Sequence, residues 1–151
     1  MAYREIAYRG WRLAVDPDST RQVYRHMRAG GADSCSCMTC LNWVAGRRRF
    51  FPREAIRFFE GIGVDYRKEV EVYDLGRMQP GLHFYGGWFH FIGAIHAKSH
   101  GPIRITSWFS ISKFSRARDL ADERFGSRPL VQIDFAATVP WLLGSDLEPE
   151  D

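Results

Sequence analysis

Hydrophobic and polar positions alternate with a period of two in several parts of the chain, which is the pattern of half-buried strands. Residues 3–15 alternate loosely around a glycine, and residues 69–75 alternate cleanly. Weaker alternation runs through residues 103–112 and 130–135. Each of these segments predicts a β-strand, and the first predicts two strands with a break at the glycine.

Other segments have the spacing of a helix with one apolar face. The first helix is expected after the turn at residues 16–19 and before the glycine pair 30–31. The second starts at Pro52, which suits the first turn of a helix, and ends at a glycine within residues 61–63. Residues 115–125 are polar and form a candidate for a third, short helix.

A β-hairpin is predicted around the glycine pair 86–87, because two glycines meet the positive-φ requirement of a two-residue turn. In that register Tyr85 faces Trp88, and His83 faces His90. All four side chains then share one side of the hairpin, with the histidine Cβ atoms about 5 Å apart. Tyr85 and Trp88 would line a pocket for a planar ligand. Alternatively, the histidines only hydrogen-bond to neighbours or water.

The elements together predict an α+β fold, in which two or three helices pack on an antiparallel sheet. The chain has 151 residues, of which 45% are hydrophobic and 15% aromatic, enough for a core without a metal or disulfide. A single domain is expected over residues 1–144. Residues 145–151 are rich in acidic side chains and are expected to be a disordered tail.

Charge is distributed unevenly along the chain. Residues 1–57 contain 11 arginines and 5 acidic residues, a balance of +6, whereas residues 119–151 contain 2 arginines and 8 acidic residues, a balance of −6. The two ends attract each other within the fold, or the basic part has an acidic or nucleic-acid partner.

One basic cluster adjoins aromatic residues. Arg47, Arg48 and Arg49 precede two phenylalanines and are expected in an exposed loop, where they would bind phosphates or stack on bases. No groove-reading motif accompanies them, so the alternative is a solvated loop.

The start of the chain is charged and has no apolar targeting segment, and the most apolar stretch, residues 88–95, is too short to cross a membrane. The three cysteines lie within six positions, whereas a secreted disulfide framework spreads an even number along the chain. We therefore expect a cytoplasmic protein with reduced thiols.

Cys35, Cys37 and Cys40 form a C-x-C-x-x-C motif, and clustered thiolates are typical zinc ligands. A closed structural zinc site needs four ligands, so His83 or His90 is expected to complete the set, with His26 as the local alternative. Two other interpretations stay open. The thiols are inert and packed, or they are reactive through the Cys37–Cys40 spacing, which is also found in redox disulfides.

Three functional hypotheses follow, since signatures of common catalytic sites are absent from the sequence. The first is a non-catalytic binding or interaction module, with a protein or small-molecule partner and a cysteine–histidine site that holds zinc. The second is an enzyme that uses a cysteine thiolate beside a histidine. The third is a weak nucleic-acid binder that uses the Arg-rich N-terminal part.

Three segments carry a resemblance: CSCMTCLNW at residues 35–43, FPRE at residues 51–54 and GLHFYGGW at residues 81–88. Together they resemble a group of small bacterial proteins of unknown function that share a C-x-C-x-x-C-x-N stretch and an L-H-x-Y-G-G hairpin. The similarity covers roughly residues 20–95. The resemblance implies that the cysteine segment and the hairpin form one structural unit and contact each other in the fold.

Overall fold

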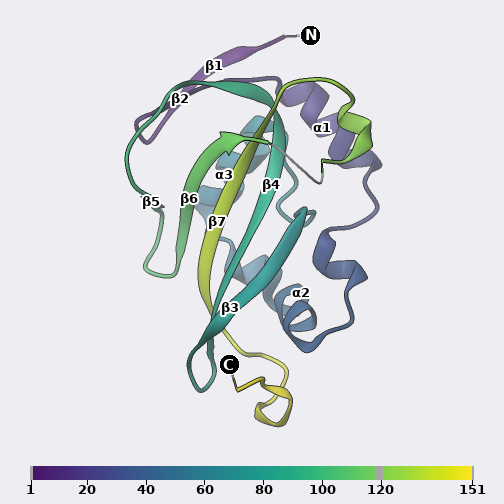
Figure 1. Ribbon diagram of the computed structural model, residues 1–151, viewed down its shortest axis with the longest axis vertical. Coiled ribbons are helices and arrows are strands. Elements are labelled where there is room, and N and C mark those ends of the chain that lie inside the picture. Colours follow the sequence, from purple (N-terminus) through teal and green to yellow (C-terminus); the bar gives the residue numbers. More distant parts are fainter. Residues whose placement is uncertain (1, 118–120, 151) are drawn as a thin grey trace.

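The fold is an antiparallel sheet with helices on it, as the sequence predicts (Figure 1). A computed structural model describes residues 2–117 and 121–150. Within these residues there are seven strands: β1 (Arg4–Tyr8), β2 (Trp11–Val15), β3 (Glu71–Gln79), β4 (Leu82–Ala97), β5 (Ile103–Arg104), β6 (Phe109–Arg116) and β7 (Leu130–Pro140). The helices are α1 (Pro17–His26), α2 (Met38–Phe50) and α3 (Arg53–Ile62), with short 3-10 helices at η1 (Gly31–Ser34), η2 (Glu123–Phe125) and η3 (Ser145–Leu147). The α+β prediction is confirmed.

The long strand β4 is at the centre of the sheet, whose order is β1-β2-β4-β7-β6-β5, with β3 also paired to β4. One edge of β4 pairs with β7 from Leu82 to Ile92. The other edge is shared, because β3 pairs with its first half and β2 pairs with its last residues.

Helix α1 fills the interval between β3 and β2 along this shared edge. The Tyr24 hydroxyl donates to the carbonyl oxygen of His90 at 2.6 Å, and the Thr20 hydroxyl accepts from the amide of Ile92 at 3.0 Å. Both side chains are buried. Buried backbone groups need partners, so these side chains satisfy the backbone of β4 where neither β3 nor β2 pairs with this edge.

Helices α2 and α3 cover one face of the sheet, behind it in Figure 1. Trp43 of α2 stacks on Phe135 of β7 with ring centroids 5.5 Å apart, and Phe59 of α3 packs on Phe89 of β4 at 4.9 Å. Phe51, between the two helices, contacts Phe135 as well. The aromatic residues of the sequence therefore form one core between the helices and the sheet.

The predicted hairpin at the glycine pair is wrong, because residues 86 and 87 lie within β4 and the turn that precedes this strand is at residues 80–81. Neither Gly86 nor Gly87 has a positive φ. Both are required by close packing instead. A Cβ on Gly86 would lie 2.9 Å from the Tyr73 ring, and one on Gly87 would lie 2.5 Å from the carbonyl oxygen of Glu71.

Most other predicted elements are present with shifted ends. The strands on either side of Gly10 and the helix that ends at Gly63 are confirmed. Helix α1 starts at Pro17, earlier than expected, because the Asp16 side chain caps it by accepting from Ser19 N at 3.1 Å. The candidate helix at residues 115–125 is wrong at both described ends, which belong to β6 and η2. Residues 118–120 lie outside the described part.

Two further expectations need correction. The arginine segment at residues 47–49 is not a loop but the last turn of α2. Within the tail that was expected to be disordered, residues 145–147 form η3 and Glu148 accepts hydrogen bonds, while Asp151 lies outside the described residues. None of the described helices has the length and apolar character needed to cross a membrane.

Candidate metal centre

The three cysteines lie on one short segment between η1 and α2. Cys35 directly follows η1, Cys37 is the N-cap residue of α2, and Cys40 is in the first turn of that helix. The Cys37 sulfur accepts a hydrogen bond from the amide of Cys40 at 3.4 Å, so the thiol occupies the usual place of a capping oxygen. The start of α2 thus brings the three cysteine side chains of the C-x-C-x-x-C motif close together.

The sulfur atoms of the motif are close enough to share an ion. Cys35 Sγ is 3.1 Å from Cys37 Sγ, and all three Sγ atoms lie within 4.8 Å of one another. Tetrahedral zinc with bonds of about 2.3 Å to sulfur places its ligands about 3.8 Å apart. One observed separation is shorter than that value and none exceeds 4.8 Å, so the cluster could hold a metal ion after small side-chain rotations.

The surroundings favour the thiolate form of the most exposed cysteine. A hydrogen bond between Cys37 Sγ and the Thr39 hydroxyl at 3.2 Å, with further bonds from Cys35 and from the Cys40 amide, lowers the pKa of Cys37 to about 6. Cys40 is half-buried, and burial raises its pKa. Because metal ions bind thiolates, Cys37 is the thiol best prepared for binding.

The C-terminal side of the cysteine segment is fixed to the sheet. The Tyr85 hydroxyl of β4 donates to the carbonyl oxygen of Thr39 at 2.8 Å. Asn42, which is fully buried, donates to the carbonyl oxygen of Pro140 at 3.2 Å and accepts from the amide of Leu142 at 2.6 Å. These contacts hold the first turn of α2, which carries Cys40, against β4 and the end of β7.

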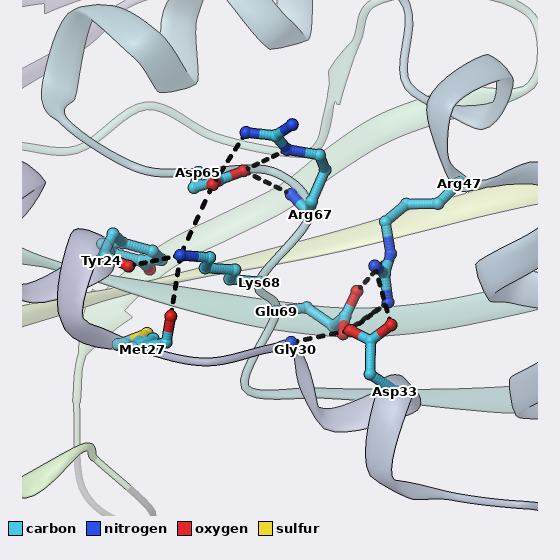
Figure 2. Close-up of polar contacts among 9 residues, drawn as sticks. All are labelled: Tyr24, Met27, Gly30, Asp33, Arg47, Asp65, Arg67, Lys68 and Glu69. Atoms are coloured by element: carbon cyan, nitrogen blue, oxygen red, sulfur yellow. Dashed lines mark hydrogen bonds and ion pairs between the residues drawn. The ribbon is translucent and has the colours of Figure 1, made fainter.

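The N-terminal side of the segment is held by a partly buried ion group, shown in Figure 2. Arg47 of α2 contacts Asp33 of η1 at 3.0 Å and Glu69 at 3.1 Å. Glu69 also accepts from Trp43 Nε1 and from the amide of Ala32, both at 3.2 Å. Burial raises the pKa of Glu69 to about 7, although the charge of Arg47 acts in the opposite direction.

The roles of Arg47 and Glu69 are not visible in the sequence. The arginine was expected to be exposed, yet its side chain is 9% exposed and that of Glu69 is completely buried. The pair is 22 residues apart in sequence, and no local pattern joins them. Because Arg47 links η1 to α2 across the cysteine segment, the ion group fixes the spacing of the two elements that carry the thiols.

The two candidate histidines do not join the thiols. His83 is buried between two carboxylates, with Nδ1 3.0 Å from Asp74 and Nε2 2.8 Å from Glu148. His90 contacts Gln132 through Nε2 at 3.2 Å, and burial lowers its pKa. Among the described residues, the metal-ligand cluster consists of the three cysteines alone.

The prediction that His83 and His90 face each other across a hairpin is wrong for a geometric reason. His83 and His90 are on the same strand and seven residues apart, so they point to opposite faces of the sheet. The local alternative, His26, is exposed on α1, where its Nδ1 lies 2.8 Å from the carbonyl oxygen of Gln22.

The proposed planar-ligand pocket is not formed either. Tyr85 is completely buried on the helix-covered face, against Trp43 at 5.2 Å between ring centroids. Trp88 is half-buried on the opposite face, 6.1 Å from the Tyr73 ring. The two aromatic side chains are therefore separated by the sheet.

Two basic side chains that follow α3, Arg67 and Lys68, are held by hydrogen bonds or ion pairs within the protein. Lys68 Nζ donates to the carbonyl oxygens of Tyr24 and Met27 at 2.7 and 2.9 Å, as Figure 2 shows. These carbonyls are at the negative end of α1. Arg67 pairs with Asp65 at 3.0 Å.

Arg48 and Arg49 are exposed on α2, and nucleic-acid binding through them stays a prediction.

Comparisons with protein-family models, curated proteins and solved structures found no match to the chain.

Proposed function

We propose that the protein is a non-catalytic zinc-binding module in which Cys35, Cys37 and Cys40 supply three thiolate ligands. The observation that carries the proposal is the convergence of the three Sγ atoms within 4.8 Å. Thiolates in a tetrahedral arrangement are typical zinc ligands, and the protein needs no redox change to hold this ion.

The fourth position of the ion is left open by the described residues, since the cluster contains only the three thiols. The site is at the surface, where Cys37 is exposed. A water molecule, a small ligand or a side chain of a partner protein therefore has access to the ion. This arrangement suits a binding or interaction role, because the bound zinc would accept one further donor atom from outside.

The scaffold supports binding because both ends of the cysteine segment are fixed before a metal arrives. Arg47 joins Asp33 on the N-terminal side, and Tyr85 holds Thr39 on the C-terminal side. Since little backbone ordering is left for the binding step, the conformational entropy lost on binding is small.

Metal content with matched variants tests the proposal. The protein is purified without added metal, titrated with zinc, and analysed for bound zinc per chain. We expect about one equivalent for the unchanged protein, and less than about 0.2 for Cys37→Ser, because a serine hydroxyl is not a thiolate ligand. Serine is a good N-cap residue, so this variant keeps the start of α2.

Ser36→Ala is the control, because Ser36 is exposed and lies between two of the ligands. It should bind zinc as the unchanged protein does. Zinc content below about 0.2 equivalents in the unchanged protein, or equal content in Cys37→Ser, would contradict the proposal.

A further inference from the structure

Cys37 and Cys40 differ in accessibility although they belong to one cluster. Cys37 is exposed at the N-cap of α2, whereas Cys40 is half-buried one turn further along the helix. An exposed thiol with a second thiol behind it is the arrangement that disulfide exchange requires, since one sulfur attacks and the other resolves. We infer that the metal-free protein exchanges thiols with external disulfides, with Cys37 as the attacking group and Cys40 as the resolving group.

The reaction balances in two steps. The Cys37 thiolate attacks one sulfur of the external disulfide, forms a mixed disulfide and releases one external thiolate. The Cys40 thiolate then attacks the Cys37 sulfur, forms the Cys37–Cys40 disulfide and releases the second external thiolate. The external disulfide gains two electrons, and the two protein thiols lose them. A reducing dithiol returns the protein to its starting state.

Hydrogen bonds stabilise the thiolate of Cys37, which is the form that attacks in the first step. The Thr39 hydroxyl lies 3.2 Å from its sulfur, and the Cys40 amide donates to the same sulfur at 3.4 Å. The positive end of the α2 macrodipole is at this position as well.

Cys40 is better placed than Cys35 to resolve the mixed disulfide. Cys35 and Cys37 flank a single residue between η1 and α2, so no helical turn brings their Cα atoms together. Residues three apart at the start of a helix are separated by about 5 to 6 Å, which is inside the allowed range. The Cys35 and Cys37 sulfurs touch at 3.1 Å, yet the backbone geometry favours Cys40.

The inference rests on the thiol geometry and not on zinc binding, although both use the same side chains. Metal-free full-length protein is mixed with oxidised glutathione, quenched with acid and analysed by mass spectrometry. We expect the unchanged protein to form an internal Cys37–Cys40 disulfide. Cys40→Ser should accumulate glutathione on Cys37, since its resolving thiol is gone.

Cys37→Ser should react at least about tenfold more slowly than the unchanged protein, because the remaining thiols are less exposed. Ser36→Ala, with all three thiols present, should react like the unchanged protein. Circular dichroism checks that each variant is folded.

The inference is overturned if Cys37→Ser reacts as fast as the unchanged protein. It is also overturned if Cys40→Ser still closes an internal disulfide, which would assign the resolving step to Cys35. Repeating the reaction with saturating zinc separates the two proposals. Exchange without zinc binding contradicts only the metal proposal, and zinc binding without exchange in the metal-free protein contradicts only this one.

Discussion

At the residue level, the group of Arg47, Asp33 and Glu69 combines a buried cation with one buried and one partly exposed carboxyl group. A buried charge is costly unless it is paired, and removing one partner leaves the others without compensation. Arg47 and its neighbour Arg48 look equivalent in the sequence, but one is buried in this group and the other is exposed. The two positions therefore respond differently to substitution.

Arg47→Ala is expected to lower the free energy of unfolding by about 3–5 kcal/mol, because it leaves Glu69 buried beside Asp33 without a cation. Arg48→Ala is the matched control and should change stability by less than about 0.5 kcal/mol. Urea unfolding followed by tryptophan fluorescence measures both. Equal effects of the two substitutions would show that the Arg47 ion group is not a stabilising feature.

Glu69 predicts a specific pH dependence of stability. Its pKa is raised to about 7 in the fold, compared with about 4.3 in an unfolded chain. Between these values the native state binds more protons, so its stability falls as the pH rises. The Glu69 contribution is fully present below about pH 4 and is lost as the pH passes 7, a total change on the order of 3–4 kcal/mol.

Glu69→Gln removes this titration while keeping a polar side chain of similar size. The difference in unfolding free energy between the unchanged protein and the variant should therefore shift by about 2–3 kcal/mol between pH 5 and pH 8, which is most of the total change. If the two stability curves run parallel over this interval, Glu69 does not titrate as the structure indicates.

At the level of helices and strands, hydrophobic periodicity predicted the elements whose position is set by local side-chain patterns. Helix α3 was identified because its apolar face, its proline start and its glycine end all lie within twelve residues. Strand β4 was misassigned at the glycine pair because glycine has two uses, and sequence does not distinguish them. At Gly86 and Gly87 the reason for glycine is a neighbour from another strand, Tyr73 or Glu71.

The packing role of these glycines gives a prediction for β4. Gly87→Ala should destabilise the protein by about 1–3 kcal/mol, because the new methyl group overlaps the Glu71 carbonyl oxygen and the Phe135 ring. Gly61→Ala in α3 meets no atom within 4 Å and should stabilise the protein by up to about 1 kcal/mol. Thermal unfolding compares the two variants. A neutral Gly87→Ala would mean that β4 and β3 are less tightly packed than described.

At the scale of the whole molecule, the end of the chain returns to the start of β4. Glu148 accepts from the amide of Gly81 and contacts His83, both at 2.8 Å. The acidic composition of the tail predicted disorder, but composition alone carries no information about a partner 65 residues away. Both ring nitrogens of His83 face carboxylates, so both contacts are hydrogen bonds when each nitrogen carries a proton.

Glu148→Ala should reduce the free energy of unfolding by about 1–3 kcal/mol, because the buried His83 and the Gly81 amide lose their acceptor. Glu150→Ala is the control, since Glu150 is exposed and also belongs to the acidic tail. Chemical unfolding of both variants measures the difference. The same stability for both would indicate that the tail contributes only through its overall charge.

The candidate site shows the same division between local and long-range information. The cysteine motif was identified from sequence because its three ligands lie within six positions. The incorrect histidine partners came from the incorrect hairpin register, which placed His83 and His90 on one face. The ion group that supports the segment joins residues from η1, α2 and the segment before β3, and only the tertiary structure brings these together.

X-ray absorption spectroscopy of the zinc-loaded protein is the sharpest test of the three-thiolate site, because it reports the atoms bound to the ion. We expect three sulfur ligands at about 2.3 Å and one oxygen or nitrogen ligand at about 2.0–2.1 Å. Two or fewer sulfur ligands per zinc would contradict this expectation, since Cys35, Cys37 and Cys40 would then not bind the ion together.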